Sequence, residues 1–276
     1  MQASEASPSD ARAGRPRTKD GAVHVCPLSA LAEIVARHQA SHLLTCLQDA
    51  VLVATPDLVL PERHLRLPMH DISEPMLGAA RQKVGERGLR NVTLLLGDAQ
   101  VFALEPASFD IATSRMGVMF FADPAAAFRN IGGALKSSGR LVFACWGPLA
   151  ENRHWLISHD IAQRHLGPPA PQPAHEPSPL AFADPDYIRG VLAAAGFADV
   201  SVERAHPMII CGSPEEEARQ ALAMGPTARL IEEKKPDAAT RQMIAREIEA
   251  AFAAEAGSDQ MRLPATIFLV AARHPV

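Results

Sequence analysis

Two aspartates fall at the ends of consecutive predicted strands, where a carboxylate could bind a nucleotide. Asp71 follows the segment LRLPMH, and Asp98 ends the segment NVTLLLGD, 27 residues later. Ligands of doubly wound sheets bind at the carboxyl ends of the strands. There, one carboxylate can accept two hydrogen bonds from a ribose diol, and the other can accept one from the exocyclic amine of adenine. Either aspartate alone is explained more simply as a helix N-cap or a turn residue, but the pair favours nucleotide binding.

Helices and strands alternate around these aspartates. The predicted elements are a helix at 75–88, strands at 91–98 and 108–115, a helix at 123–135, a turn at 137–140 and a strand at 141–146. Pro75 suits a first helical turn and Gly88 a helix end. Asp123 is a predicted N-cap, followed by Pro124 at the first helical position. This alternation is typical of βαβ units and a parallel sheet.

The pattern changes after Trp146. We expect a helix at 152–166, a proline-rich loop at 167–179, a helix at 184–197, a strand at 199–210, two helices within 214–256 broken near Pro236, and a closing strand at 264–273. A buried stripe is predicted at Met243, Ile244, Ile248 and Phe252. The sequence thus predicts an α/β, Rossmann-like fold. It has a mostly parallel sheet of about six or seven strands, helices on both faces, an antiparallel last strand pair and a helical cap.

The domain organisation is read from shifts in composition. Residues 1–20 are polar and charged and are expected to be a disordered tail, and 21–276 a single domain. Within that domain, 71–150 is the expected cofactor-binding core, and 151–180 and 213–260 are cap insertions. The segment 21–70 is atypical. Residues 28–50 have helical spacing, whereas prolines at 56, 61 and 68 argue against a central strand in 51–69.

The stretch DISEPMLGAARQKVGERGLRNVTLLLGDAQ, followed by SFDIATSRMGVMFFADPAAAFRNIGGALKSSGRLVFACW, resembles the core of class I S-adenosylmethionine-dependent methyltransferases. It is most similar to the small-molecule, ubiquinone-biosynthesis-like group. The segments FADPDYIRGVLAAAGFADVSVE and PATIFLVAAR are similar to the later helix and antiparallel strands of that group. The resemblance implies a methyltransferase that uses S-adenosylmethionine and acts on a small molecule.

The same resemblance implies roles for ten residues. Asp71 would hold the ribose hydroxyls and Ile72 would pack on adenine. Gly97 would lie in the adenine loop, Asp98 would accept from the adenine amine, and Ala99 would donate its backbone N–H to the ring. Ser114 and Arg115 would line the methionine end of the cofactor, and Met119, Phe120 and Phe121 would face the substrate.

One family feature is missing from the sequence. A glycine loop of the form acid-x-G-x-G-x-G is expected near 45–51, where this chain reads TCLQDAV. No glycine occurs between Gly21 and Gly78, and no G-x-G occurs anywhere. Only glycine lets the backbone approach the cofactor closely there. Three explanations stay open: a divergent replacement of the loop, a degenerate methyltransferase fold acting as a binding or structural module, or a shifted reading frame across 21–70.

Other chemistries find less support in the sequence. No P-loop, G-x-S-x-G or HExxH motif occurs, and a nicotinamide-dependent oxidoreductase would also need a glycine fingerprint. His154, His159 and His165 lie five and six residues apart, a spacing that does not align them on one helical face, so no metal site is predicted. If the acceptor needs a general base, His154 and His159 are candidates, but the pattern assigns no catalytic residue.

Composition narrows the class of protein. With 47% hydrophobic residues, 21% charged residues and a net charge of −4, the chain is globular and has no basic field for nucleic acid. Its four cysteines form no CxxC pair. No apolar run approaches the ~20 residues that span a bilayer. We expect a cytoplasmic protein with a small-molecule substrate, no nucleic-acid partner and no membrane span, whose oligomeric state the sequence does not indicate.

Overall fold

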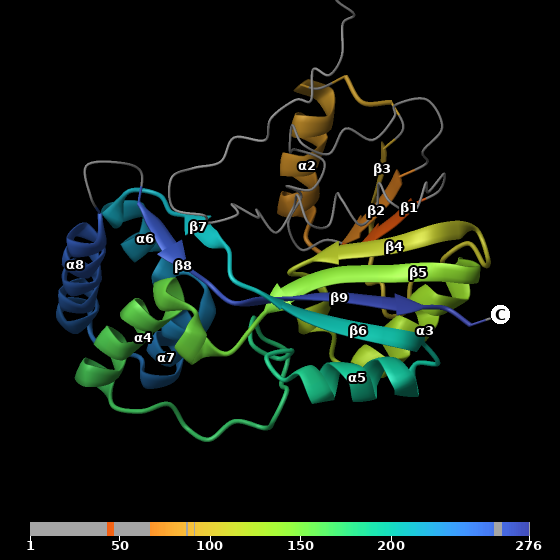
Figure 1. Ribbon diagram of the computed structural model, residues 1–276. Coiled ribbons are helices and arrows are strands. Elements are labelled where there is room, and N and C mark those ends of the chain that lie inside the picture. The colour runs from red at the N-terminus through yellow and green to blue at the C-terminus, as the bar shows by residue number, and fades with distance from the viewer. Residues whose placement is uncertain (1–42, 47–66, 87, 91, 257–260, 276) are drawn as a thin grey trace, which may run out of the picture.

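The computed structural model describes residues 43–46, 67–86, 88–90, 92–256 and 261–275. Its centre is a seven-stranded sheet in the order β3-β2-β1-β4-β5-β9-β6 (Figure 1). The strands are β1 Leu43–Cys46, β2 Leu67–Asp71, β3 Val92–Leu96, β4 Phe109–Arg115, β5 Leu135–Trp146, β6 Ala198–Ala205 and β9 Ile267–Arg273. Strands β1 to β5 pair in parallel, and β9 is antiparallel to both β5 and β6. The predicted α/β fold with an antiparallel last pair is confirmed.

Helices cover both faces of this sheet. Helix α2 (Glu74–Glu86) lies on one face, and α3 (Pro124–Ala134) and α5 (Pro185–Ala194) lie on the other (Figure 1). Helix α3 begins as predicted: Asp123 is its N-cap and accepts from the backbone N–H of Ala126, with Pro124 in the first turn. Under α3, the rings of Phe128 and Phe143 stack at 5.5 Å and are fully buried. This aromatic core fixes α3 against the sheet and so fixes the loop that precedes it.

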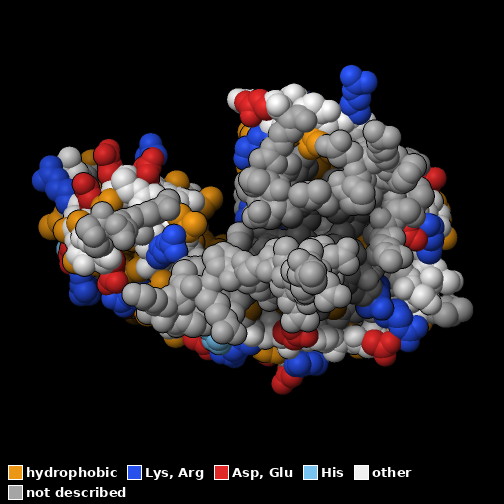
Figure 2. Space-filling view, turned by 45° about the horizontal axis from the view of Figure 1, so that its top comes forward, with side chains coloured by type: hydrophobic (Ala, Val, Ile, Leu, Met, Phe, Trp, Pro, Cys, Tyr) orange, Lys and Arg blue, Asp and Glu red, His pale blue; other side chains and the backbone are white. Residues whose placement is uncertain are grey.

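A second set of elements forms a lobe beside the sheet, the cap lobe. It contains α4 (Arg153–Leu166), α6 (Pro214–Ala221), α7 (Gly225–Lys234), α8 (Ala238–Glu255) and a two-stranded sheet of β7 (Met208–Ile210) and β8 (Arg262–Pro264). Its own core includes Ile161, Leu230 and Phe252. On the face seen in Figure 2, acidic and basic side chains of the described residues are interspersed. Within the described part of the chain, no helix has the length and apolar character needed to cross a membrane.

Two expectations for the atypical N-terminal segment are wrong where the structure describes it. Residues 43–46, inside the stretch with helical spacing, form strand β1. Strand β2 contains Pro68 and still has a strand on each side. Its pairing with β1 starts at Met69, one residue after the proline, so the missing N–H does not interrupt that ladder. The predicted tail at 1–20 lies outside the described residues.

Several predicted elements are divided in the structure. The predicted strand 199–210 is β6 and β7, and the predicted closing strand 264–273 falls on β8 and β9. Pro207, between β6 and β7, has no N–H to continue a ladder. The predicted turn at 137–140 is an irregularity inside β5, with Ser138 at φ 64°.

The expected two helices of 214–256 are three. The break near Pro236 is confirmed, and a further break precedes Gly225, whose φ of 80° an L-residue rarely adopts. Ile244, Ile248 and Phe252 are buried as predicted. Met243 is half exposed, so its place in the predicted stripe is wrong.

Candidate active site

Parallel pairing brings the predicted cofactor residues to one edge of the sheet. Strand β2 ends at Asp71, directly opposite Leu96 at the end of β3. The backbone N–H of Gly97 donates to the carbonyl of Asp71 at 3.0 Å. The turn that carries Asp98 therefore starts beside Asp71.

Asp71 and Ile72 differ sharply in exposure. The Asp71 side chain is buried, and its Oδ1 accepts from the backbone N–H of Ser73 at 2.7 Å, which fixes the carboxylate at the start of α2. Ile72 is 70% exposed. This arrangement suits a ligand that joins a flat ring to a polar sugar. The ring could pack on the exposed Ile72 side chain, and the sugar hydroxyls could donate to the Asp71 carboxylate.

The loop after β3 holds Asp98 in one orientation. Asp98 Oδ1 accepts from the backbone N–H of Gln100 at 2.9 Å, and Oδ2 accepts from the Gln100 side-chain amide at 2.9 Å. The other end of that amide, Oε1, accepts from the backbone N–H of Asp123. Gln100 thus ties the carboxylate to the start of α3. Sequence reasoning missed this residue, since only its spacing of two from Asp98 hinted at it.

Asn130 is a second residue that the sequence did not single out. From α3 its amide donates to the carbonyls of Ala99 at 2.8 Å and of Phe102 at 2.9 Å. The Phe102 ring covers Gly97, where an added Cβ would lie 2.4 Å from the ring. This close approach of the Phe102 ring requires glycine at position 97. Ala99, whose carbonyl accepts from Asn130, is buried.

Ser114 and Arg115 end β4 at the same edge, next to β5. Ser114 is 1% exposed, and no hydrogen-bond partner for its Oγ is found among the described residues. A buried hydroxyl without a partner is uncommon and indicates a ligand or a water at this position. Arg115 is half-buried and lies opposite Ala144 of β5.

The residues expected on the substrate side come shortly after Arg115 in the sequence. Val118–Phe120 form a short 3-10 helix, η2, and Met119 within it is 1% exposed. The Met119 sulfur accepts from the backbone N–H of Trp146 at 3.5 Å. Phe120 and Phe121 are partly buried against the sheet core. Met119 is therefore part of the buried core beside the end of β5, while Phe120 and Phe121 are more exposed.

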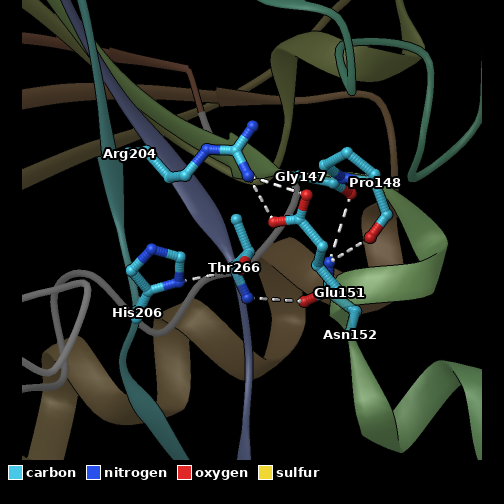
Figure 3. Close-up of polar contacts among 7 residues, drawn as sticks. All are labelled: Gly147, Pro148, Glu151, Asn152, Arg204, His206 and Thr266. Atoms are coloured by element: carbon cyan, nitrogen blue, oxygen red, sulfur yellow. Dashed lines mark hydrogen bonds and ion pairs between the residues drawn. The ribbon is translucent and has the colours of Figure 1, made fainter.

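The connection between the sheet and the cap lobe is a compact polar neck, formed by Gly147, Pro148, Asn152 and Thr266 (Figure 3). The fully buried Asn152 amide donates to the carbonyls of Gly147 at 3.2 Å and Pro148 at 2.9 Å. Its Oδ1 accepts from the backbone N–H of Thr266 at 3.1 Å.

An ion pair covers the neck on the outside. Glu151, in the 3-10 helix η3 (Leu149–Glu151), accepts from Arg204 at 2.5 Å, and this hydrogen bond lowers the pKa of the carboxyl. The neck thus positions the end of β5 and the start of α4 relative to each other.

The three histidines of α4 have separate surroundings. His159 Nε2 contacts the amide of Gln163 at 2.8 Å, and His165 Nε2 contacts Glu247 at 2.6 Å. His154 lies between the two tryptophans, 5.0 Å from each ring centroid. Of the expected position of the missing glycine loop, only Thr45 and Cys46 are described, and both belong to β1.

Known proteins with similar sequences are methyltransferases. Residues 56–143 match the family model described as methyltransferase domain, a match that begins after the expected glycine loop. The nocamycin O-methyltransferase of Saccharothrix syringae is 30% identical over 156 residues, which are 54% of this chain and 55% of that protein. The chain therefore spans about half the length of this curated relative.

Solved structures share the fold. A putative methyltransferase of Bacillus halodurans superposes with a TM-score of 0.54 and 18% identity, covering 90% of this chain and 99% of that one. A phosphoethanolamine N-methyltransferase of Haemonchus contortus, solved with S-adenosylhomocysteine, gives a TM-score of 0.53 and 19% identity over 91% of this chain and 53% of that one. Residues 56–143 thus match a methyltransferase domain model, and the fold is shared with these solved structures, in line with the resemblance to the class I family.

Proposed function

We propose that this protein transfers a methyl group from S-adenosylmethionine to a small-molecule acceptor. The observation that carries the proposal is the pair of carboxylates, Asp71 and Asp98, on adjacent strand ends linked by the Gly97–Asp71 backbone hydrogen bond. The exposed Ile72 beside them and the buried Ser114 hydroxyl, which has no partner among the described residues, fit the same ligand. The curated relative named as an O-methyltransferase supports a small acceptor.

Each residue of the site has a definite task in this proposal. Asp71 would hold the ribose hydroxyls, Ile72 and Ala99 the adenine ring, and Asp98 the adenine amine. Ser114 and Arg115 would face the methionine end. S-adenosylmethionine supplies an electrophilic methyl group on a positively charged sulfur. The protein contributes orientation of the two reactants and exclusion of water.

The test is a calorimetric titration with S-adenosylmethionine and S-adenosylhomocysteine. We expect one equivalent to bind to the wild-type protein. Asp98→Asn should weaken binding by about 1.5–3 kcal/mol, roughly 10- to 100-fold. The reason is that the adenine amine would then donate to a neutral amide oxygen and no longer to a charged carboxylate. Asp186→Asn is the matched control, since the Asp186 side chain is 93% exposed and pairs with Arg189 on α5, which packs against β6, at the opposite end of the strand order from β2 and β3.

A folded wild-type protein that gives no heat with millimolar ligand would contradict the proposal. That result would favour the second function, a methyltransferase fold that acts as a binding or structural module. The sequence observation behind this alternative is the absence of any glycine from 22 to 77. Sequencing the gene through this region would then show whether a single-base change restores a glycine loop.

A further inference from the structure

Both tryptophans of the chain lie in one aromatic cluster at the neck. The chain has two tryptophans, Trp146 at the end of β5 and Trp155 in the first turn of α4, with His154 between them in the sequence. The ring centroids of His154 and Trp146, and of His154 and Trp155, lie 5.0 Å apart. The two indoles meet edge to face at 5.8 Å. Three rings in mutual contact offer flat, polarisable walls.

Two nitrogens in this cluster are buried and have no partner. Neither His154 Nδ1 nor Trp155 Nε1 makes a hydrogen bond to any described residue. Indole N–H can only donate, whereas a neutral imidazole nitrogen can accept. A buried polar atom without a partner costs free energy unless a ligand or a water satisfies it. On these two adjacent residues, one donor and one acceptor thus have no partner among the described residues, and together they match the two hydrogen-bonding functions of one hydroxyl group.

The cluster adjoins the proposed methyl-transfer edge. Strand β5 runs beside β4, with Ala144 opposite Arg115, so Trp146 lies two residues beyond the end of β4 on the neighbouring strand. The backbone of Trp146 also contacts Met119, the residue expected on the substrate side. Ligands that occupy this cluster therefore lie next to the expected methionine end of the cofactor.

Trp155 is held firmly in this position. Its six-membered ring lies directly on Gly225 at the start of α7, where an added Cβ would lie 1.4 Å from Cζ3. Burial lowers the pKa of His154 to about 4, which keeps the imidazole neutral and able to accept at neutral pH. Rigid aromatic walls and a neutral acceptor select for shape and for a hydroxyl rather than for charge.

We propose that Trp146, His154 and Trp155 form the acceptor site, and that it binds a flat aromatic or enolic hydroxyl whose proton faces His154 Nδ1 and whose oxygen faces Trp155 Nε1. This inference rests on the proposed function, because it assigns the acceptor class of the same site. His154 is then a specificity-determining residue that contacts the hydroxyl itself.

The probes are 2-naphthol, 2-methoxynaphthalene and the saturated decalin-2-ol, titrated by calorimetry with and without S-adenosylhomocysteine. The indole N–H NMR signals are a second readout, specific because both tryptophans of the chain belong to the cluster. We expect 2-naphthol to bind about tenfold more tightly than 2-methoxynaphthalene, which cannot donate. Decalin-2-ol should bind several-fold more weakly, since it lacks the ring stacking.

Three variants test the histidine. His154→Phe keeps a ring and should abolish the preference for 2-naphthol. His154→Asn places an amide near the position of Nδ1 and should retain much of the preference, which a merely structural role would not produce. His165→Phe is the matched control on the same helix, expected to behave as wild type because His165 contacts Glu247 of α8 and not the aromatic cluster.

The inference is overturned if the wild-type protein binds the two naphthalenes equally, if 2-naphthol leaves both indole N–H signals unshifted, or if His154→Phe keeps the preference. A wild-type protein that shows the preference but does not bind S-adenosylhomocysteine would sink the proposed function and leave the hydroxyl site standing. The two failures are therefore distinguishable.

Discussion

Truncating Asn152 to alanine should destabilise the protein far more than a single polar residue usually does. The substitution removes three hydrogen bonds inside the neck and leaves the buried N–H of Thr266 without its acceptor. A buried backbone group that loses its partner costs about 1–3 kcal/mol. The Gly147 and Pro148 carbonyls lose a donor as well. We expect the free energy of unfolding to fall by about 2–5 kcal/mol.

The assay is denaturant unfolding followed by tryptophan fluorescence, which reports on this region because Trp146 and Trp155 flank Asn152. Arg204→Ala is the comparison variant. It removes an ion pair of the same neck whose side chains are 44% and 35% exposed, so it should cost less than about 1 kcal/mol. Asn152→Asp keeps an acceptor for Thr266 but sets a carboxylate against two carbonyls, and it should not restore stability. If Asn152→Ala costs no more than Arg204→Ala, the neck does not depend on the buried amide.

Two further predictions concern the aromatic cluster. Gly225→Ala should lower stability by about 2–4 kcal/mol and shift tryptophan emission, because the new Cβ meets Trp155 and φ is 80°. Gly190→Ala, in a helix with open space around it, should be neutral or stabilising by up to about 1 kcal/mol, and equal losses for the two variants would contradict the packing argument. Burial lowers the pKa of His154 to about 4, so the stability associated with its neutral ring is complete above the unfolded pKa of about 6.5 and is lost as pH falls towards about 4. Unfolding titrations should show a loss of up to about 2 kcal/mol between about pH 7 and about pH 5 that His154→Phe removes, and the same pH slope in both proteins would refute this assignment.

The parts of the fold predicted from sequence are those with local signals. Asp123 and Pro124 mark the start of α3, Gly88 follows α2, and the short apolar runs became β3 and β4. Pro68 argues against a central strand at β2, and only the register with β1 shows why the proline is tolerated. The pairing of β7 with β8 joins residues more than fifty positions apart, and no local pattern encodes it.

Some residues of the candidate site could likewise be predicted from the sequence, and others could not. Asp71 and Asp98 were recognisable because each follows an apolar run and the pair has a characteristic spacing. Gln100 and Asn130 were not, since they act through contacts to backbone atoms on other elements. Asn152 was predicted only as the start of a helix, whereas in the structure its amide joins three chain segments.

The placement of β9 also bears on the order in which the protein can assemble. Among the described strands, β6 pairs only with β9, which lies between β5 and β6 in the sheet. Residues 267–273 are synthesised after all the other described strands, so β6 has no neighbour until they emerge from the ribosome. Until then the apolar edge of β5, with Val142 and Phe143, is open to strands of other chains. Co-translational folding of this sheet therefore ends with an insertion step, and the nascent protein is most exposed to aggregation just before it.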